Sequence, residues 1–382
     1  MYTRILKPPH RKSFFLFGPR GTGKTTWLKT QFPQALYFDL LNAEVYNDLL
    51  ARPHRLAQMI PETWQDWVVL DEVQRVPELL HEVHRLIESR HLYFALTGSS
   101  ARKLKRGEVN LLAGRALTSF MYPLTAEELG RDFKLSHALR FGHLPLTFQE
   151  HDPKRYLESY VTTYLREEVQ QEGLTRNLGA FSRFLEVASF SQAQLLNIST
   201  VARECAVHRK VAESFFSILE DLLIAARVPV FTKKAKRRMV MHSKLFFFDA
   251  GIYRALRPRG PLDTPEDIDG AALETLIFQE VRAINHYYQF GYEIFFWRTA
   301  NGQEVDLVLY GPRGIIGIEI KRSARITDEM FKGLNVFMKD YPMARAYFLT
   351  GGDRDGWEGN IRVLPVEKFL RQLHELLEKS VS

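Results

Sequence analysis

The stretch FFLFGPRGTGKTT, residues 14–26, joins a short apolar run to a glycine-rich loop and then to a helical segment. Its central part, Gly18 to Thr25, fits the phosphate-binding pattern GxxxxGK[ST] at every position and has the strand-before, helix-after context that the pattern requires. Glycines let backbone N–H groups surround phosphate oxygens, and the helix N-terminus adds a favourable dipole. Lys24 is expected to reach the β- and γ-phosphates of ATP, and Thr25 to bind Mg²⁺. The residues predicted to bind the nucleotide in this stretch are Gly18, Pro19, Arg20, Gly21, Thr22, Gly23, Lys24, Thr25 and Thr26.

Two adjacent acids, Asp71 and Glu72, follow the apolar run WVVL. A buried strand that ends in carboxylates presents them at the C-terminal edge of a sheet, where ligands bind in parallel α/β folds. We expect Asp71 to hold the Mg²⁺ and its waters, and Glu72 to activate the attacking water. Two surface acids at a strand end would be the alternative, but the preceding phosphate loop favours a catalytic role.

The segment ALTGSS, residues 95–100, is another strand that ends in small hydroxyl residues. Thr97, Ser99 or Ser100 is expected to contact the γ-phosphate, although such residues also serve simple turns. Arg115 precedes the next strand-like run. It is predicted either to reach a neighbouring subunit's ATP as an arginine finger or to form a surface salt bridge.

The order of elements divides the chain into three parts. Strand-like runs at 14–17, 35–40, 67–72, 92–98 and 115–124 alternate with helical patterns such as 77–89, which predicts a mostly parallel α/β sheet. Helical patterns dominate after residue 125, and a Pro/Gly/Asp-rich linker is predicted at 257–270. The predicted domains are 1–125, 126–256 and 257–382.

Four motifs carry a family resemblance: GPRGTGKTT, LDEVQ, LTGSSARKL, and LAGRA followed by YPLTAEEL. This set resembles the prokaryotic AAA+-type ATPases that are joined to a C-terminal domain of unknown function. The resemblance implies nucleotide-dependent assembly into a homo-oligomer, with a hexameric ring as the leading hypothesis, and it favours Arg115 as an arginine finger. This sequence departs from the AAA+ pattern in one respect, because Thr or Ser replaces the usual sensor Asn.

The middle part has the outline of a winged helix: a short helix at 199–206, a longer one at 207–223, and strands at 224–231 and 240–249. The longer helix is expected to bury Val211, Phe215 and Leu219 and to present Arg209 and Lys210 to DNA. The segment KKAKRR at the expected wing tip supplies further phosphate contacts. The alternatives are a protein-binding winged helix and a solvated charge run. The predicted DNA-binding residues are Arg209, Lys210, Lys233, Lys234, Lys236, Arg237 and Arg238.

The last part places acids and a lysine on two neighbouring strands, with Glu304 and Asp306 on one and Glu319 and Lys321 on the next. Strand alternation puts each pair on one face. The spacing resembles the PD-(D/E)XK, or restriction-endonuclease-like, core. That resemblance implies a site of Glu280, Asp306, Glu319 and Lys321 on an α/β fold, with Asp306 and Glu319 as Mg²⁺ ligands and Glu274 as the alternative to Glu280. A surface ion pair, or a fold kept only as a scaffold, would explain the same residues.

Composition indicates what kind of partner the protein binds and which compartment it occupies. The formal net charge of +7 over 382 residues favours a polyanionic partner. The single cysteine, Cys205, excludes an internal disulfide, and no apolar run reaches membrane-spanning length, so a cytoplasmic protein is expected.

Together the patterns predict an ATP- and Mg²⁺-dependent motor that translocates on or remodels duplex or branched DNA, with junction branch migration and Mg²⁺-dependent cleavage as further hypotheses. The second hypothesis is a nucleotide-switched regulatory or defence ATPase with a non-catalytic C-terminal module.

Overall fold

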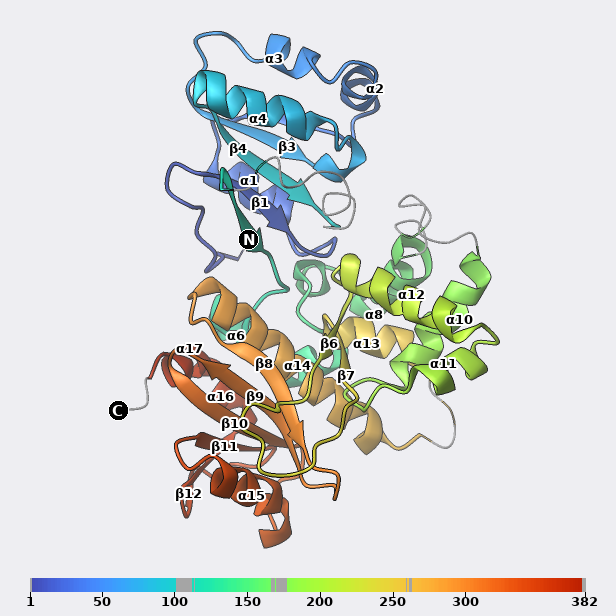
Figure 1. Ribbon diagram of the computed structural model, residues 1–382, viewed down its shortest axis with the longest axis vertical. Helices are drawn as coiled ribbons and strands as arrows, with labels where there is room; N and C mark the ends of the chain where they lie inside the picture. The colour runs from blue at the N-terminus through green and yellow to red at the C-terminus, as the bar shows by residue number, and fades with distance from the viewer. Residues whose placement is uncertain are drawn as a thin grey trace. The chain divides into compact units, whose positions relative to one another are not determined.

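The computed structural model describes residues 2–100, 112, 114–165, 169, 177–258, 260 and 263–379. They form two compact units, shown in Figure 1. The N-terminal unit comprises Thr3–Tyr122 and Asp221–Ile224, and the C-terminal unit comprises Met1–Tyr2, Pro123–Glu220 and Ala225–Ser382. Within the described residues, no helix combines the length and the apolar character needed to cross a membrane.

The N-terminal unit is built on a five-stranded parallel sheet with the order β2-β3-β4-β1-β5. This confirms the parallel α/β sheet predicted from the sequence. The strand β4 lies between β1, which leads into the glycine-rich loop, and β3, which ends at Asp71. The strands are β1 Ser13–Phe17, β2 Leu36–Asp39, β3 Trp67–Asp71, β4 Tyr93–Gly98 and β5 Ala116–Phe120.

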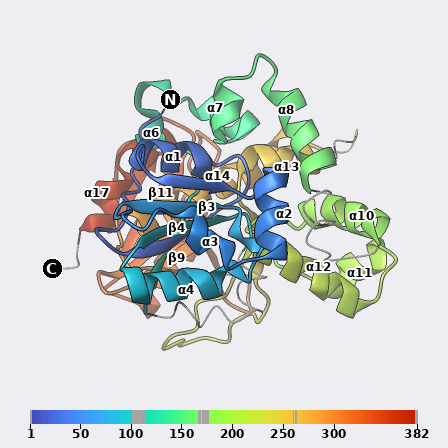
Figure 2. The same ribbon diagram turned by 90° about the horizontal axis from the view of Figure 1, so that it is seen from above.

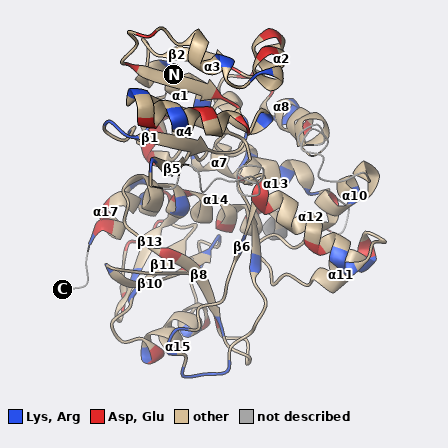
Figure 3. Cartoon of the chain, turned by 45° about the horizontal axis from the view of Figure 1, so that its top comes forward, with Lys and Arg blue, Asp and Glu red and all other residues tan. Residues whose placement is uncertain are grey.

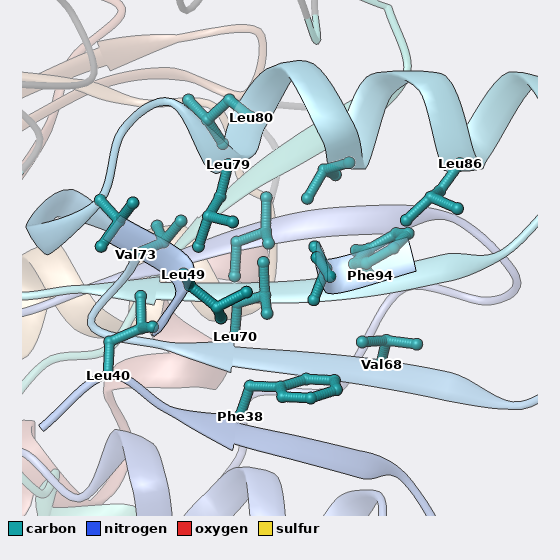
Figure 4. Packing of buried hydrophobic residues seen from close by; sticks show 14 of the residues in the cluster. Phe38, Leu40, Leu49, Val68, Leu70, Val73, Leu79, Leu80, Leu86 and Phe94 are labelled. Atoms are coloured by element: carbon teal, nitrogen blue, oxygen red, sulfur yellow. The ribbon is translucent and has the colours of Figure 1, made fainter. Parts of the chain in front are cut away.

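Helices cover both faces of this sheet. On one face, Trp27 of α1 packs edge-on against Phe14 of β1. On the other face, Leu79 and Leu86 of α4 belong to a buried cluster with residues of the strands, as Figure 4 shows. Because helices cover both faces of the sheet, the ends of its strands are the part left open for polar residues. The helices are α1 Lys24–Gln31, α2 Ala43–Ala51, α3 Arg55–Met59 and α4 Leu79–Arg90.

The first part of the C-terminal unit is helical and ends in a short antiparallel strand pair, β6–β7. Phe181 and Phe184 of α10 pack against Phe215 of α12, and Figure 2 shows α10, α11 and α12 grouped together. The helical pattern expected after residue 125 is observed here, with α8 followed directly by a π-helical turn, Tyr160–Tyr164. The elements are α6 Ala126–Leu129, α7 Leu135–Phe141, α8 Pro153–Ser159, α10 Leu178–Ser189, α11 Ile198–Glu204, α12 Arg209–Asp221, β6 Ala225–Val228, β7 Lys244–Phe247 and α13 Ala250–Leu256.

The second part of the C-terminal unit is a six-stranded mixed sheet with the order β12-β13-β11-β10-β9-β8. Its antiparallel strands β8, β9 and β10 follow the long helix α14 and carry the acids singled out in the sequence. The elements are α14 Pro265–Tyr287, β8 Glu293–Arg298, β9 Glu304–Gly311, β10 Gly314–Lys321, α15 Lys332–Asp340, β11 Arg345–Thr350, β12 Gly356–Glu358, β13 Ile361–Pro365, α16 Val366–Arg371 and α17 Leu373–Glu378.

The predicted linker at 257–270 is too long. Helix α14 begins at Pro265, inside that stretch. Proline is compatible with the first helical turn, where its missing N–H has no intrahelical partner. The abundance of Pro, Gly and Asp therefore marks the start of a helix as well as the loop before it.

Candidate active site

The loop between β1 and α1 has a backbone path that depends on its glycines. Gly21 and Gly23 have φ values of 81° and 94°, in the left-handed region that favours glycine. A Cβ atom on Gly18 would lie 2.4 Å from the carbonyl oxygen of Met121, so this position leaves no room for a side chain. Arg20 of the loop and Thr26 of α1 are exposed, whereas Thr22 is buried and donates a 2.8 Å hydrogen bond to the Pro19 carbonyl.

Lys24 places a positive charge within this loop. Its Nζ donates hydrogen bonds to the carbonyl oxygens of Gly18, at 2.7 Å, and of Pro19, at 3.2 Å. The side chain is buried, and burial of an ammonium group is costly unless polar atoms surround it. The carbonyl groups of the loop therefore hold the Lys24 ammonium group inside the loop, where an anionic ligand is expected to bind.

Asp71 lies at the centre of the site and accepts hydrogen bonds from three hydroxyl groups. Thr25 Oγ1 donates to its Oδ2 at 2.8 Å, the Tyr37 hydroxyl donates to the same oxygen, and the Thr97 hydroxyl donates to Oδ1. Burial and the nearby Asp71 carboxylate raise the pKa of Tyr37 well above its ordinary value, so this phenol stays a donor. The fold thus brings together Thr97 and the two residues predicted to bind Mg²⁺ at the nucleotide site, Thr25 and Asp71.

Glu72 is held beside Asp71 by a second set of contacts. Its backbone has φ 62°, which is uncommon for a residue other than glycine, and its N–H donates to Thr97 Oγ1 at 2.9 Å. Gln74 Nε2 donates to Glu72 Oε2 at 2.5 Å and to Ser99 Oγ at 2.9 Å, and Ser99 Oγ lies 3.4 Å from the same carboxylate oxygen. Non-glycine residues in this backbone region cluster at functional sites, because the surrounding structure must stabilise them.

Arg115 forms the surface ion pair that was one of its two predicted roles. Its Nε donates to Glu88 Oε1 at 2.5 Å, and both side chains are exposed. The hydrogen bond and the charge of Arg115 lower the pKa of Glu88. A flexible arginine at the surface is compatible with a role in a neighbouring subunit, which stays a prediction.

A second polar site lies in the C-terminal unit. We call Glu274, Glu304, Asp306 and Glu319 the acid cluster. Two lysines neutralise part of it: Lys321 Nζ lies 2.6 Å from Glu319 Oε1, and Lys244 Nζ lies 2.5 Å from Glu304 Oε1. Asp306 Oδ2 accepts a 2.8 Å hydrogen bond from the backbone N–H of Ile320, which fixes β9 against β10 at this point.

Hydrogen bonding in the acid cluster is incomplete. The Oε2 atoms of Glu274 and Glu319 are buried and accept no hydrogen bond. Burial, together with the charge of Asp306, raises the pKa of both carboxyl groups to about 8. Burial acts to lower the pKa of Lys244, but the surrounding carboxylates outweigh it and raise the pKa above its ordinary value.

The donor types in the acid cluster suit Mg²⁺, but their arrangement does not fit a metal ion. Among the described residues, no three carboxylate, imidazole or thiolate groups converge closely enough to hold one. The ammonium of Lys244 lies among the carboxylates instead. The acid cluster is therefore compensated by a lysine side chain in the place where a metal ion was predicted.

Glu280 does not join the acid cluster, so the choice of Glu280 from the PD-(D/E)XK resemblance is wrong. It is buried elsewhere in the C-terminal unit, where its Oε1 accepts a 2.8 Å hydrogen bond from the backbone N–H of Ala126 and lies 3.1 Å from His143 Nδ1. Glu274, the alternative choice, lies six residues earlier on α14. Six residues amount to about 600° of helical rotation, which turns the two side chains to different faces.

The basic segment KKAKRR is exposed, as predicted, but it does not form a free wing tip. The segment between β6 and β7 runs along the edge strand β8, where Phe231 N–H donates to the Phe296 carbonyl at 2.7 Å and Ala300 N–H donates to the Arg238 carbonyl at 2.8 Å. Two of its cations are paired: Lys233 with Glu293 at 2.6 Å, and Arg237 with Asp340 at 2.8 Å. Figure 3 shows this stretch in blue beside α15.

Helix α12 has the expected polar start, and two of the three residues expected on its buried face, Phe215 and Leu219, are buried. Arg209 and Lys210 are exposed at its N-terminus. Val211, which was expected to be buried, is 38% exposed, and Ala212 and Phe216 are buried. The prediction is therefore wrong only for Val211, at the first turn, and the buried face also includes the positions next to Val211 and Phe215.

Three parts of the chain match known sequence families. Residues 10–130 match the family described as AAA domain, residues 132–263 match a domain of unknown function (DUF8612), and residues 269–369 match another (DUF4143). Residues 10–130 are therefore similar to AAA-type P-loop domains. The match supports nucleotide binding and ATPase activity in general terms, whereas the other two descriptions leave the winged-helix and restriction-endonuclease-like assignments as predictions.

Sequence similarity to two other proteins extends over most of the chain. It is 24% identical over 379 residues to the uncharacterized proteins Mb2031c of Mycobacterium bovis and Rv2008c of Mycobacterium tuberculosis, covering 96% of this chain and 83% of each relative. Similar solved structures include the Aeropyrum pernix ORC2 protein in its ADPNP-ADP complexes, with a TM-score of 0.32, 14% identity, and coverage of 57% of this chain and 82% of that chain. The ORC1 protein of the same organism in complex with DNA has a TM-score of 0.27, 15% identity, and coverage of 65% and 87%.

Sequence reasoning missed Tyr37 and Gln74 in the AAA-type domain and Lys244 in the acid cluster. Gln74 belongs to the quoted motif LDEVQ, so its position two residues after Glu72 was a usable signal. Tyr37 reaches its site because β2 pairs with β3, and Lys244 reaches the acid cluster because its side chain on β7 contacts Glu304 of β9.

Proposed function

We propose that this protein is an ATP- and Mg²⁺-dependent, DNA-binding AAA+ motor that remodels or translocates on duplex or branched DNA. Its division into an ATPase domain (1–125), a helical and winged-helix domain (126–256) and a restriction-endonuclease-like domain (257–382) is part of the proposal. The AAA-type match over residues 10–130 supports the ATPase part.

The observation that carries the ATPase mechanism is the contact of Thr25 with Asp71 at 2.8 Å, beside Glu72. A hydroxyl and a carboxylate at this separation are suitable ligands for Mg²⁺ and its waters, and the ion would neutralise charge that develops on the phosphates. Lys24 would hold the β- and γ-phosphates. Glu72, oriented by Gln74 and Ser99, would accept a proton from the attacking water.

The DNA-binding part is supported by exposed cations. Lys234, Lys236 and Arg238 of the basic segment are exposed, as are Arg209 and Lys210 at the start of α12. Such residues bind phosphates with little preference for base sequence. The order of three helices and two antiparallel strands, α10 to β7, supports a winged helix in outline.

The test of the motor is ATP turnover with no DNA and with duplex, single-stranded and four-way DNA. We expect at least one DNA to stimulate kcat severalfold, with four-way DNA as the leading candidate if branch migration is the activity. Equal turnover under all four conditions would refute the motor but leave the ATPase intact. Lys24→Ala should abolish turnover throughout and serves as the background control.

The basic segment offers a matched pair of variants for DNA binding. Replacing Lys234, Lys236 and Arg238 together by alanine removes the exposed cations for which no ion pair is described. Replacing Lys233 and Arg237 removes those already neutralised by Glu293 and Asp340. Each lost phosphate contact lowers the slope of log affinity against log salt by about 0.9, so the first variant should lose about 2 to 3 and the second less than 1. Equal slopes in both variants would remove this segment from the DNA interface.

We further propose that the protein is a homo-oligomer, as a hexameric ring, in which Arg115 completes a neighbour's ATP site. Lys24→Ala subunits retain Arg115, and Arg115→Ala subunits retain an intact P-loop. Each variant alone should be inactive, and mixing them should restore part of the turnover because mixed interfaces contain one complete site. Wild-type turnover in Arg115→Ala, or no recovery on mixing, contradicts a role in trans.

A restriction-endonuclease-like active site is the weaker part of the proposal. The element order α14, β8, β9, β10, α15, β11 and the residues Asp306, Glu319 and Lys321 support that fold, and Mg²⁺-dependent nicking lost in Lys321→Ala would establish cleavage. The position of Lys244 among the acids favours a second candidate function. In that candidate, a nucleotide-switched regulatory or defence ATPase carries a non-catalytic C-terminal module, and no nicking occurs in Mg²⁺ at any DNA concentration.

A further inference from the structure

Lys244 is a lysine in the C-terminal unit whose side chain is almost completely buried. It lies on β7, in the strand pair that precedes the six-stranded sheet, and only 3% of its side chain is exposed. Its Nζ lies 2.5 Å from Glu304 Oε1, 3.6 Å from Glu274 Oε2 and 3.6 Å from Asp306 Oδ1. One ammonium group thus faces carboxylates from α14 and β9 together.

A buried ion pair of this kind affects the stability of the fold more than a surface ion pair does. A buried ammonium group is tolerated only where nearby carboxylates compensate for the lost hydration, and removing one partner of such a group is strongly destabilising. Exposed pairs such as Lys233 with Glu293 contribute little. Lys244 and the acid cluster therefore depend on each other.

The charges around Lys244 also show what the cluster lacks. Four carboxylates, those of Glu274, Glu304, Asp306 and Glu319, face the cations of Lys244, Lys321 and Arg298, the last at 2.7 Å from Glu304. The Glu319 side chain is 8% exposed, and its Oε2 has no hydrogen-bond partner. The cluster therefore lacks hydrogen-bond donors for two of its buried oxygens, Oε2 of Glu274 and Oε2 of Glu319, and Lys244 is the cation that lies closest to the first of them.

We propose that Lys244 is a tethered counter-ion that takes the place of a divalent metal ion among Glu274, Glu304 and Asp306. A metal ion bridges carboxylates from separate elements, and the ammonium does the same here while belonging to β7. A free divalent ion reaches these oxygens only by displacing Lys244. The strand pair β6–β7 is thereby fastened to α14 and β9 by charge. This inference does not depend on ATP hydrolysis or DNA binding.

The inference is tested by measuring Mn²⁺ binding to the full-length chain by calorimetry. All proteins carry Asp71→Asn, which weakens metal binding at the nucleotide site. Lys244→Met keeps a long side chain without the charge, and it should bind Mn²⁺ at least tenfold more tightly than the chain that retains Lys244. Lys233→Met, which removes an exposed Lys–Glu pair in the same unit, should leave the affinity unchanged. Equal Mn²⁺ affinity with and without Lys244 overturns the proposal.

Thermal unfolding provides a second measurement if Lys244→Met folds poorly. We expect the Tm of Lys244→Met to fall and 1 mM Mn²⁺ to restore it, with a smaller effect of Mn²⁺ on the chain with Lys244. The double variant Lys244→Met/Glu304→Gln removes one carboxylate with the cation and should recover part of the Tm without metal. If both variants stay unfolded with and without Mn²⁺, or fold without any gain in Mn²⁺ binding, Lys244 has only a packing role and the proposal is wrong.

Discussion

Gln74 offers a sharp test of how Glu72 is held. Its Nε2 lies 2.5 Å from Glu72 Oε2 and 2.9 Å from Ser99 Oγ, and the side chain is buried. Gln74→Ala removes both hydrogen bonds but no charge. Glu72 would keep its backbone position, because its N–H still donates to Thr97. The carboxylate would then lose the donor that fixes its orientation toward the attacking water.

The size of the effect follows from the kind of hydrogen bond. A hydrogen bond to a charged group contributes about 1.5–3 kcal/mol, of which only the part expressed in the transition state alters kcat. A loss of about 1.4–2.8 kcal/mol corresponds to a 10- to 100-fold decrease in kcat. KM for ATP should change less than about twofold, since the hydrogen bonds of Gln74 go to Glu72 and Ser99 and uniform nucleotide binding is untouched.

Steady-state ATP turnover, with the Tm of each variant recorded beside it, provides the measurement. Ser99→Ala is the matched control, because Ser99 Oγ lies at the longer distance of 3.4 Å from Glu72 Oε2. Its kcat should fall less than in Gln74→Ala. If Gln74→Ala leaves kcat within twofold of the wild type, or raises KM alone, Gln74 does not position Glu72 and the reasoning is refuted.

Three further outcomes are expected. Tyr37→Phe removes one hydroxyl donor from Asp71 and should lower the free energy of unfolding by about 1–2 kcal/mol. Differential scanning calorimetry should show this decrease, and the difference from the wild type should be smaller when Mg²⁺ and ATP are present. An unchanged Tm would contradict the prediction. Gly98→Ala places a Cβ 2.9 Å from Gln74 Oε1 and should destabilise the chain by about 1–3 kcal/mol and reduce turnover, whereas wild-type kcat and Tm would show that the site can adjust. Burial lowers the pKa of His137 to about 4, so the stability that its neutral form contributes is complete above pH 6.5 and is lost as the pH falls from 6.5 toward 4. His137→Phe should therefore lose less stability over that interval than the wild type, by about 1 kcal/mol for a partly exposed ring, and parallel Tm–pH curves would contradict it.

The sequence was most informative where the signal is local. The strand predicted at 67–72 is observed as β3, Trp67–Asp71, and the helix predicted at 77–89 as α4, Leu79–Arg90. The glycine pattern of the loop also specifies its backbone, because the left-handed conformations of Gly21 and Gly23 are a property of those residues. Periodicity and turn chemistry act over a few residues, and single sequences record them well.

The rest depends on contacts between distant segments. Tyr37 reaches Asp71 because β2 pairs with β3 in a register that places Asp39 beside Asp71. The choice between Glu274 and Glu280 depended on the rotation of α14, and an error of that kind moves a side chain to another environment. The basic segment had the composition of a free loop, but the residues on either side of it, Val230 and Met239, pair with Phe296 and Thr299. None of these contacts leaves a periodic signal in the chain.

The two acidic sites differ in what satisfies their carboxylates, and this difference bears on function. Asp71 is held by the hydroxyls of Thr25, Tyr37 and Thr97. Hydroxyls are neutral, and the waters around Mg²⁺ can replace the hydrogen bonds that they donate, so the approach of a metal ion creates no charge repulsion. The acid cluster is held by ammonium groups, and a divalent ion that approaches Lys244 meets like charge at close range in a buried site.

Buried carboxylates are therefore held by neutral hydroxyl groups in one unit and by ammonium groups in the other. If this contrast is correct, Mg²⁺-dependent chemistry belongs to the AAA-type domain, and the C-terminal unit contributes binding. Metal titrations that separate the two sites, with Asp71→Asn and Lys244→Met as the opposing variants, decide it: tighter metal binding at an unaltered acid cluster than at the nucleotide site would reverse the assignment.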